Sequence, residues 1–145
     1  MSSPSLPKLD AGACLLCSVV AGAVNARRVV DTDKVIAVMN DAEPLAAGHV
    51  VFFAKRHAEK LDEMADEDAS AILVEVKRVA RAMGLENYNL LQNNGAAAGQ
   101  TVMHAHFHLI PKWSEQEGLR YDRPSGRAFE HGEIYRRLKD TLGAL

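Results

Sequence analysis

The chain has 145 residues, of which 48% are apolar and 25% are charged, and this balance is typical of a globular protein rather than a disordered one. The length is that of one domain built around a single hydrophobic core. The net charge of −2 gives no electrostatic argument for binding a nucleic-acid polymer or a membrane surface, although local donors can still hold the phosphate of a nucleotide.

The N-terminal part of the chain predicts a flexible arm and a cytoplasmic location. Residues 1–10 are expected to form the arm, because Met1–Lys8 contains two prolines and three serines. The apolar run Ala11–Val24 carries Cys, Ser and Gly, is too short to span a bilayer, and lacks the basic segment of a signal peptide. Disulfides are rare in the cytoplasm, so Cys14 and Cys17 should be thiols or metal ligands.

The elements that follow are predicted from turn residues, apolar runs and apolar spacing. Apolar residues at intervals of three and four predict the main helix, for which Asp66 can cap the start and Gly84 the end. In chain order we expect strands at Arg28–Asp31, Lys34–Asn40 and Gly48–Ala54, the main helix at Asp66–Met83, strands at Tyr88–Gln92 and Thr101–Ile110, and a C-terminal helix at Phe129–Leu142. This order predicts an α+β fold, with a mainly antiparallel sheet covered on one side.

The stretch "HAHFHLIPK" places three of the six histidines at alternate positions, at His104, His106 and His108. On a strand these three side chains share one face, and the apolar residues between them face a core. A lone histidine of this kind would be interpreted as a surface residue, but three on one face favour a functional site. Two chemistries fit the pattern: a metal site, or nucleophilic catalysis by a neutral imidazole.

A loop of small residues, "NNGAAAGQTV", leads into the histidines. Gly95 and Gly99 allow the backbone to approach a ligand closely, and loop amides together with the Asn93 and Thr101 side chains can donate to phosphate oxygens. The loop alone would be consistent with a simple hairpin connection. Its direct junction with the three histidines favours a phosphate-binding role.

These residues resemble the histidine triad (HIT) family, and the chain is closest to its Hint-like nucleotide hydrolase branch. "HAHFHLI" fits the family pattern, and the match extends over "NNGAAAGQTV", over "NDAEPLAAGHVVFFAKRH" and over "CLLCSVVAG". Together these stretches cover most of Cys14–Pro111. The resemblance implies a single HIT-like α+β domain over residues 1–145, with one long helix and a C-terminal helix; segment 112–145 matches the family less clearly.

The resemblance implies a homodimer that acts on nucleotides, most often purine nucleotides. Members of the family hydrolyse or transfer a nucleoside monophosphate at its α-phosphate, through a nucleotidyl-histidine intermediate. In the phosphoramidase branch the leaving group is an amine, and in the other main branch it is a nucleotide of a dinucleoside polyphosphate. A nucleotide-binding regulatory protein with incidental turnover, or a purely metal-binding domain, are alternatives from other classes.

The resemblance also assigns roles to individual residues. His106 is the expected nucleophile and His108 a phosphate contact. Asp41 aligns with the acid that binds the ribose. The other expected substrate contacts are Asn93, Gly99, Gln100 and Thr101 around the phosphate, and Leu15, Leu16, Val19 and Met39 around the base.

The pair Cys14 and Cys17 has the spacing C-x-x-C, which by itself is consistent with a redox motif, with two buried small residues or with a metal site. The resemblance implies a structural zinc held by these cysteines with His49 and His104, a closed Cys2His2 set that leaves His106 free to react. His57 is interpreted as a surface or hydrogen-bonding histidine. No organic cofactor is expected.

Overall fold

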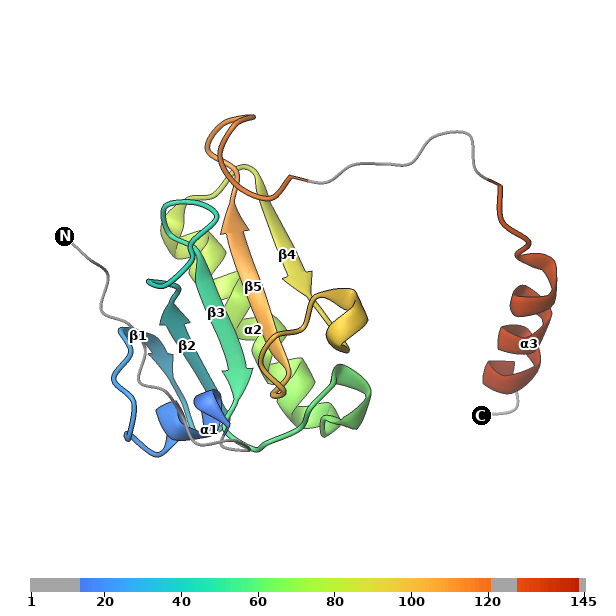
Figure 1. Cartoon of the computed structure of the whole chain (residues 1–145), viewed down its shortest axis with the longest axis horizontal. Helices are drawn as coiled ribbons and strands as arrows, with labels where there is room; N and C mark the ends of the chain where they lie inside the picture. Colours follow the sequence, from blue (N-terminus) through green and yellow to red (C-terminus); the bar gives the residue numbers. More distant parts are fainter. Residues whose placement is uncertain (1–13, 121–127, 144–145) are drawn as a thin grey trace.

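The computed structural model describes residues 14–120 and 128–143, so the expected arm at 1–10 lies outside the described residues. Five antiparallel strands form one sheet in the order β1-β2-β3-β5-β4 (Figure 1). The strands are β1 (Arg28–Asp31), β2 (Val35–Met39), β3 (Val50–Ala54), β4 (Tyr88–Gln92) and β5 (His106–Pro111). The helices are α1 (Leu15–Val20), α2 (Asp66–Met83) and α3 (Gly132–Gly143), with short 3₁₀ turns at Leu61–Glu63 and Ala96–Ala98. The predicted α+β fold is confirmed.

The two faces of the sheet are packed against different elements. Helix α2 covers one face, where Ile72 and Val76 pack with Phe52 and Leu109. On the other face, Leu16 and Val19 of α1 pack in a second cluster that contains Phe53. The prediction of a sheet covered on one side is therefore incomplete, because α1 supplies a smaller apolar layer on the second face.

Helix α2 begins and ends for different physical reasons. Gly84 ends it in the left-handed conformation, with φ of 64°, and its amide donates to the carbonyls of Ala80 and Arg81. The expected N-cap is wrong: Ala65 is the capping position and makes no side-chain cap, while Asp66 is the first residue of the helix. Three acidic residues in the first turn instead interact favourably with the positive end of the helix dipole.

Strand β5 begins five residues later than predicted, at His106 rather than at Thr101. Pairing with β3 starts where Phe53 faces His106, and the residues before this point bend away from the ladder. Phe107 and Leu109 face the α2 side, as the alternation predicted, so His106 and His108 lie on the opposite face. His104 precedes the strand, so the alternation of faces along β5 does not determine the direction of its side chain.

Helix α3 stands apart from the sheet in Figure 1, and all of its apolar side chains are exposed. Ile134, Leu138 and Leu142 follow one another at intervals of four and so form a stripe on one side of the helix. Within residues 14–120 and 128–143, the structure contains no helix with the length and apolar character needed to cross a membrane.

Candidate active site

Two of the triad rings are each fixed by a hydrogen bond to a backbone carbonyl. His104 Nε2 lies 2.8 Å from the carbonyl oxygen of Ala54, and His106 Nδ1 lies 2.7 Å from the carbonyl oxygen of His104. A carbonyl oxygen only accepts, so each of these nitrogens carries the ring proton. The unprotonated nitrogens are therefore Nδ1 of His104 and Nε2 of His106.

His106 has the features of a nucleophile held in one orientation. The residue is only 8% exposed, it opens β5 opposite Phe53, and its Nδ1–H is engaged. The lone pair on Nε2 is thereby directed away from the backbone. A neutral imidazole with one nitrogen anchored and the other free suits covalent attack on phosphorus.

The third triad ring is bonded to a fourth histidine. His49 Nε2 lies 2.9 Å from His108 Nδ1, and the amide of Leu45 donates to His49 Nδ1 over 3.1 Å. Because His49 Nδ1 accepts, its proton must be on Nε2, from which it donates to His108 Nδ1. His108 therefore carries its own proton on Nε2, where it can donate to an anion.

Burial keeps this histidine pair neutral. Burial is the main cause that lowers the pKa of His108 to about 4, and the nearby His106 and His49 contribute to this shift in the same direction. Burial also lowers the pKa of His49. At neutral pH the pair therefore acts through N–H dipoles and not through a formal positive charge.

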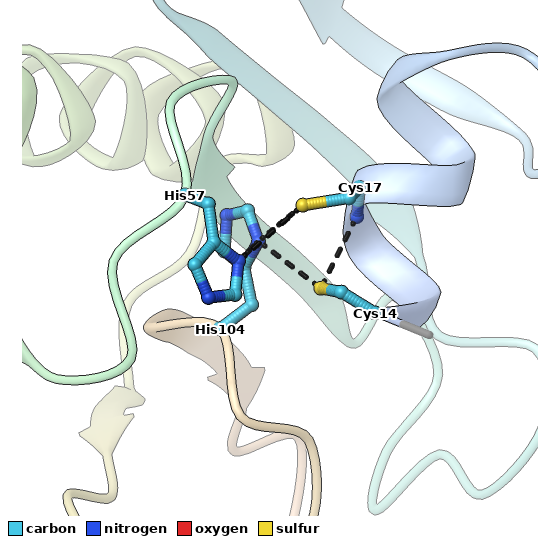
Figure 2. A group of neighbouring side chains, drawn as sticks. All are labelled: Cys14, Cys17, His57 and His104. Carbon is cyan, nitrogen blue, oxygen red and sulfur yellow. Dashed lines mark hydrogen bonds between the residues drawn. The ribbon is translucent and has the colours of Figure 1, made fainter. Parts of the chain in front are cut away.

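The structure places His57 with the two cysteines and His104, in the position expected for His49 (Figure 2). One possible ligand atom from each of Cys14, Cys17, His57 and His104 lies within 4.8 Å of every other. Strands β3 and β5 are antiparallel, so residues that follow β3 lie beside residues that precede β5. His49 precedes β3 and so lies near the other end of β5, beside His108.

The contacts within this cluster bring sulfur and nitrogen together without any carboxylate. His104 Nδ1 lies 3.4 Å from Cys14 Sγ and 3.5 Å from Cys17 Sγ, and His57 Nδ1 lies 3.3 Å from Cys17 Sγ. Both cysteines are free thiols, and burial together with the nearby Cys14 raises the pKa of Cys17 to about 11. Two sulfurs and two imidazole nitrogens are a donor set that could hold a metal ion.

The loop before the triad is built differently from the expectation. The Gln100 side chain is 3% exposed; it donates to the carbonyls of Glu59 and Val102 and accepts from the amide of Gly95. Both the amide nitrogen and the oxygen of this side chain therefore hold the loop.

The predicted phosphate donors differ in whether their N–H and O–H groups are already hydrogen-bonded within the protein. The Gly99 amide is also engaged, at 3.0 Å from the Ala96 carbonyl. Asn93 Nδ2 makes a long hydrogen bond, 3.4 Å, to the Gly99 carbonyl. Thr101 is exposed, and its amide and hydroxyl have no partner among the described residues. Thr101 and Asn93 are therefore the better candidates for phosphate contacts.

Asp41 lines a cavity of about 420 Å³ together with Arg27, His49 and Glu117. Arg27 contacts both carboxylate oxygens of Asp41, with Nε 2.9 Å from Oδ2. This hydrogen bonding is the main cause of the lowered pKa of Asp41. The carboxylate is thus ionised at neutral pH and can accept from hydroxyl groups.

The residues expected around the base are only partly brought together. Leu15, Leu16 and Val19 lie in the cluster on the α1 side of the sheet. Met39 packs against the cluster on the α2 side, although it also lines the cavity beside Asp41. The three residues of α1 therefore lie together, whereas Met39 packs on the opposite side of the sheet.

Residues 22–115 match the HIT domain family. The chain is 43% identical to the adenosine 5'-monophosphoramidase hnt1 of Schizosaccharomyces pombe over 112 residues, which are 77% of this chain and 84% of the relative. It is 41% identical to the adenosine 5'-monophosphoramidase HNT1 of Saccharomyces cerevisiae over 119 residues, which are 82% of this chain and 73% of the relative.

The fold is similar to that of solved structures as well. The crystal structure of a histidine triad nucleotide-binding protein from Candida albicans superimposes with a TM-score of 0.82 and 34% identity, over 91% of this chain and 99% of the other. Sequence, fold and the oriented triad agree, and the chain belongs to the HIT domain family.

Proposed function

We propose that this protein hydrolyses nucleoside monophosphate esters and amides of the AMP-X type at the α-phosphate, with a nucleoside phosphoramidate as the preferred substrate class. The observation that carries the proposal is the orientation of His106, whose Nδ1–H is fixed by the His104 carbonyl so that Nε2 is the free nitrogen. The relatives named as adenosine 5'-monophosphoramidases support the choice of an amine leaving group.

The reaction proceeds in two displacements at phosphorus. Nε2 of His106 attacks the α-phosphorus, the P–N bond to the ring forms, and the bond to the leaving group breaks as that group departs and takes up a proton. Water then attacks the same phosphorus and releases the nucleoside monophosphate and the free ring. His108, through Nε2–H, with Thr101 and Asn93, donates to the phosphoryl oxygens and so stabilises the charge that spreads over them.

Asp41 is the proposed ribose contact, because an ionised carboxylate accepts from two neighbouring hydroxyls. The apolar side chains of Leu15, Leu16 and Val19 lie on the same face of the sheet as His106; Leu15 is half-buried, and it is the proposed contact of a flat base, with Leu16 and Val19 packed beneath it. We propose a purine base. A panel of adenosine, guanosine and cytidine phosphoramidates tests this preference.

The decisive experiment is to trap the covalent intermediate and identify it by mass. Wild-type protein quenched in acid-free denaturant after mixing with adenosine 5'-phosphoramidate should carry one adenylyl group on the peptide that contains His106. A parallel reaction with diadenosine polyphosphates distinguishes the two leaving-group classes. Absence of the adduct and of turnover with both substrates would refute the hydrolase proposal and leave a binding role.

We propose that Cys14, Cys17, His57 and His104 hold one structural zinc ion. The donors fit this metal, because two sulfurs and two neutral imidazoles form the closed set that structural zinc sites use. The hydrogen bond from His104 Nε2 to the Ala54 carbonyl supports the proposal, since it fixes the tautomer that offers Nδ1 to the cluster. Bound zinc would tie α1 to the ends of β3 and β5.

Metal analysis of paired variants tests which histidine belongs to the site. Wild-type protein should contain about one zinc per chain, His57→Ala should lose it, and His49→Asn should keep it. Loss of zinc in His49→Asn with retention in His57→Ala would contradict the assignment.

We also propose that the protein is a cytoplasmic homodimer in which the whole chain acts as one HIT-like domain. Exposed apolar side chains on α2 (Leu73, Val74) and on the edge strand β4 (Tyr88, Leu90) offer a surface that a second copy could cover. Light scattering after size exclusion should give the mass of two chains, and a single-chain mass at micromolar concentration would refute the dimer.

A further inference from the structure

The loop after the triad strand, Trp113–Gly118, packs against the loop that joins β2 to β3. We call these the post-triad loop and the β2–β3 loop (residues 40–49). Both lie at the same end of the sheet in Figure 1, although they are about 70 residues apart, as the separation of Ala47 and Glu117 shows. The contacts between them are hydrogen bonds to the backbone.

Three hydrogen bonds join the post-triad loop to two residues of the β2–β3 loop. Trp113 Nε1–H donates to the carbonyl of Ala47 over 2.8 Å, and the Glu117 carboxylate accepts from the amide of Ala47 over 2.7 Å. The amide of Gly118 donates to the carbonyl of Leu45 over 3.0 Å. Both polar groups of the Ala47 backbone are thus held by side chains that come from beyond the triad.

One of these two β2–β3 loop residues, Leu45, selects the tautomer of His49. The amide of Leu45 is the donor to His49 Nδ1, and His49 in turn donates to His108. Leu45 therefore has its carbonyl held by Gly118 and its amide bonded to His49. If the loop moved, the Leu45 amide would no longer select the tautomer in which His49 donates to His108.

The post-triad loop has a defined conformation, stabilised by its own hydrogen bonds and by a glycine. Lys112 Nζ donates to the carbonyls of Glu115 and Leu119, which closes the loop. Gly118 has a φ of +104°, and a Cβ there would lie 2.8 Å from the carbonyl oxygen of Pro111, so the turn requires glycine.

We infer that Trp113 and Glu117 are positioning residues for the reaction: they hold the β2–β3 loop so that His49 keeps His108 in the tautomer that donates to the phosphoryl group. Neither needs to touch the substrate for this role. The kinetic part of the inference rests on the proposed hydrolase function, and the tautomer part does not.

The test compares variants that remove the two bonds with variants that keep them. Trp113→Phe retains the ring and deletes the N–H, and Glu117→Leu deletes the acceptor, whereas Glu117→Gln retains an acceptor oxygen. Glu115→Leu is the matched control, because the Glu115 side chain belongs to the same loop and makes no hydrogen bond among the described residues. Thermal unfolding of each variant shows whether it is folded at the assay temperature.

Kinetics should separate positioning from substrate binding. With adenosine 5'-phosphoramidate, Trp113→Phe and Glu117→Leu should each lower kcat roughly fivefold to tenfold, the size of one lost hydrogen bond, and change KM less than about twofold. Glu117→Gln should restore most of kcat, and Glu115→Leu should match wild type. A raised KM with unchanged kcat would show that these side chains contact substrate, and unchanged kinetics in folded variants would overturn the inference.

Nitrogen-15 spectra of the histidine rings give a readout that does not depend on turnover. In wild type, His49 should be found as the Nε2–H tautomer, and in the Trp113→Phe, Glu117→Leu double variant it should show a mixture of tautomers. An unchanged His49 signal in that double variant would overturn the inference. An inactive wild type with the expected tautomer shift would instead refute the hydrolase proposal and leave the positioning contacts supported.

Discussion

Acid should destabilise this protein through the histidines whose pKa values are lowered in the folded state, and His108, with a pKa of about 4, shows the effect clearly. In the unfolded chain a histidine titrates near pH 6.5, whereas the pKa of His108 in the folded protein is about 4. Between pH 4 and pH 6.5, His108 is mostly protonated in the unfolded state and mostly neutral in the folded state. The free energy of unfolding therefore rises with pH over this range. The contribution is therefore fully present above pH 6.5 and is lost as the pH falls toward 4.

The magnitude follows from the two pKa values. For one such group, the free energy of unfolding should fall by about 2 kcal/mol between pH 7 and pH 5, and by about 3 kcal/mol at pH 4. Urea unfolding at several pH values measures this loss. Burial lowers the pKa values of His49 and His104 as well, so these two residues contribute in the same direction. The test is therefore the difference between wild type and His108→Asn, which both retain His49 and His104.

The comparison has a clear negative outcome. The variant should lose about 2 kcal/mol less than wild type between pH 7 and pH 5. Parallel curves for the two proteins would show that His108 is not held neutral by its surroundings, and the tautomer that we derive for it would then be refuted.

Three further predictions follow from the site and from the fold. His106→Ala should still fold but lose turnover by at least about 10³-fold, together with the covalent adduct, and retained turnover would exclude His106 as the nucleophile. Asp41→Asn should raise KM about tenfold and leave kcat within about threefold of wild type, because its proposed role is to bind the ribose; a fall in kcat alone would contradict this. Gly84→Ala should lower the free energy of unfolding by about 1 kcal/mol, because the position has φ of +64° and open space around it, and thermal unfolding measures the loss.

The sequence predicts most of the strands and the long helix because their signals are local. The apolar spacing of Asp66–Met83 and the stop at Gly84 need no knowledge of the rest of the chain, and the observed bounds of α2 are the predicted ones. The start of β5 is not local, because it depends on where Phe53 begins to pair with His106. The alternating sequence pattern includes His104, but the hydrogen-bonded strand begins only at His106.

The assignment of histidines to partners was the part that the sequence could not settle. His57 follows two basic residues and is exposed, so its sequence context resembles that of a surface residue. Its nitrogen nevertheless lies 3.2 Å from that of His104, which is 47 residues away in the chain. Knowing that β3 and β5 are antiparallel neighbours would have paired His57 with His104 and His49 with His108, but that adjacency appears only in the folded sheet.

The row of N–H groups that ends at His108 determines how the enzyme should respond to salt. The Leu45 amide, His49 and His108 each point a proton toward the next acceptor, and none of them carries a formal charge at neutral pH. Dipoles aligned in this way polarise one another, which strengthens the last donor. Dissolved ions screen exposed charges over about 10 Å at 0.1 M ionic strength, but they act weakly on neutral groups. Turnover should therefore tolerate ionic strengths that weaken phosphate sites made of lysine and arginine.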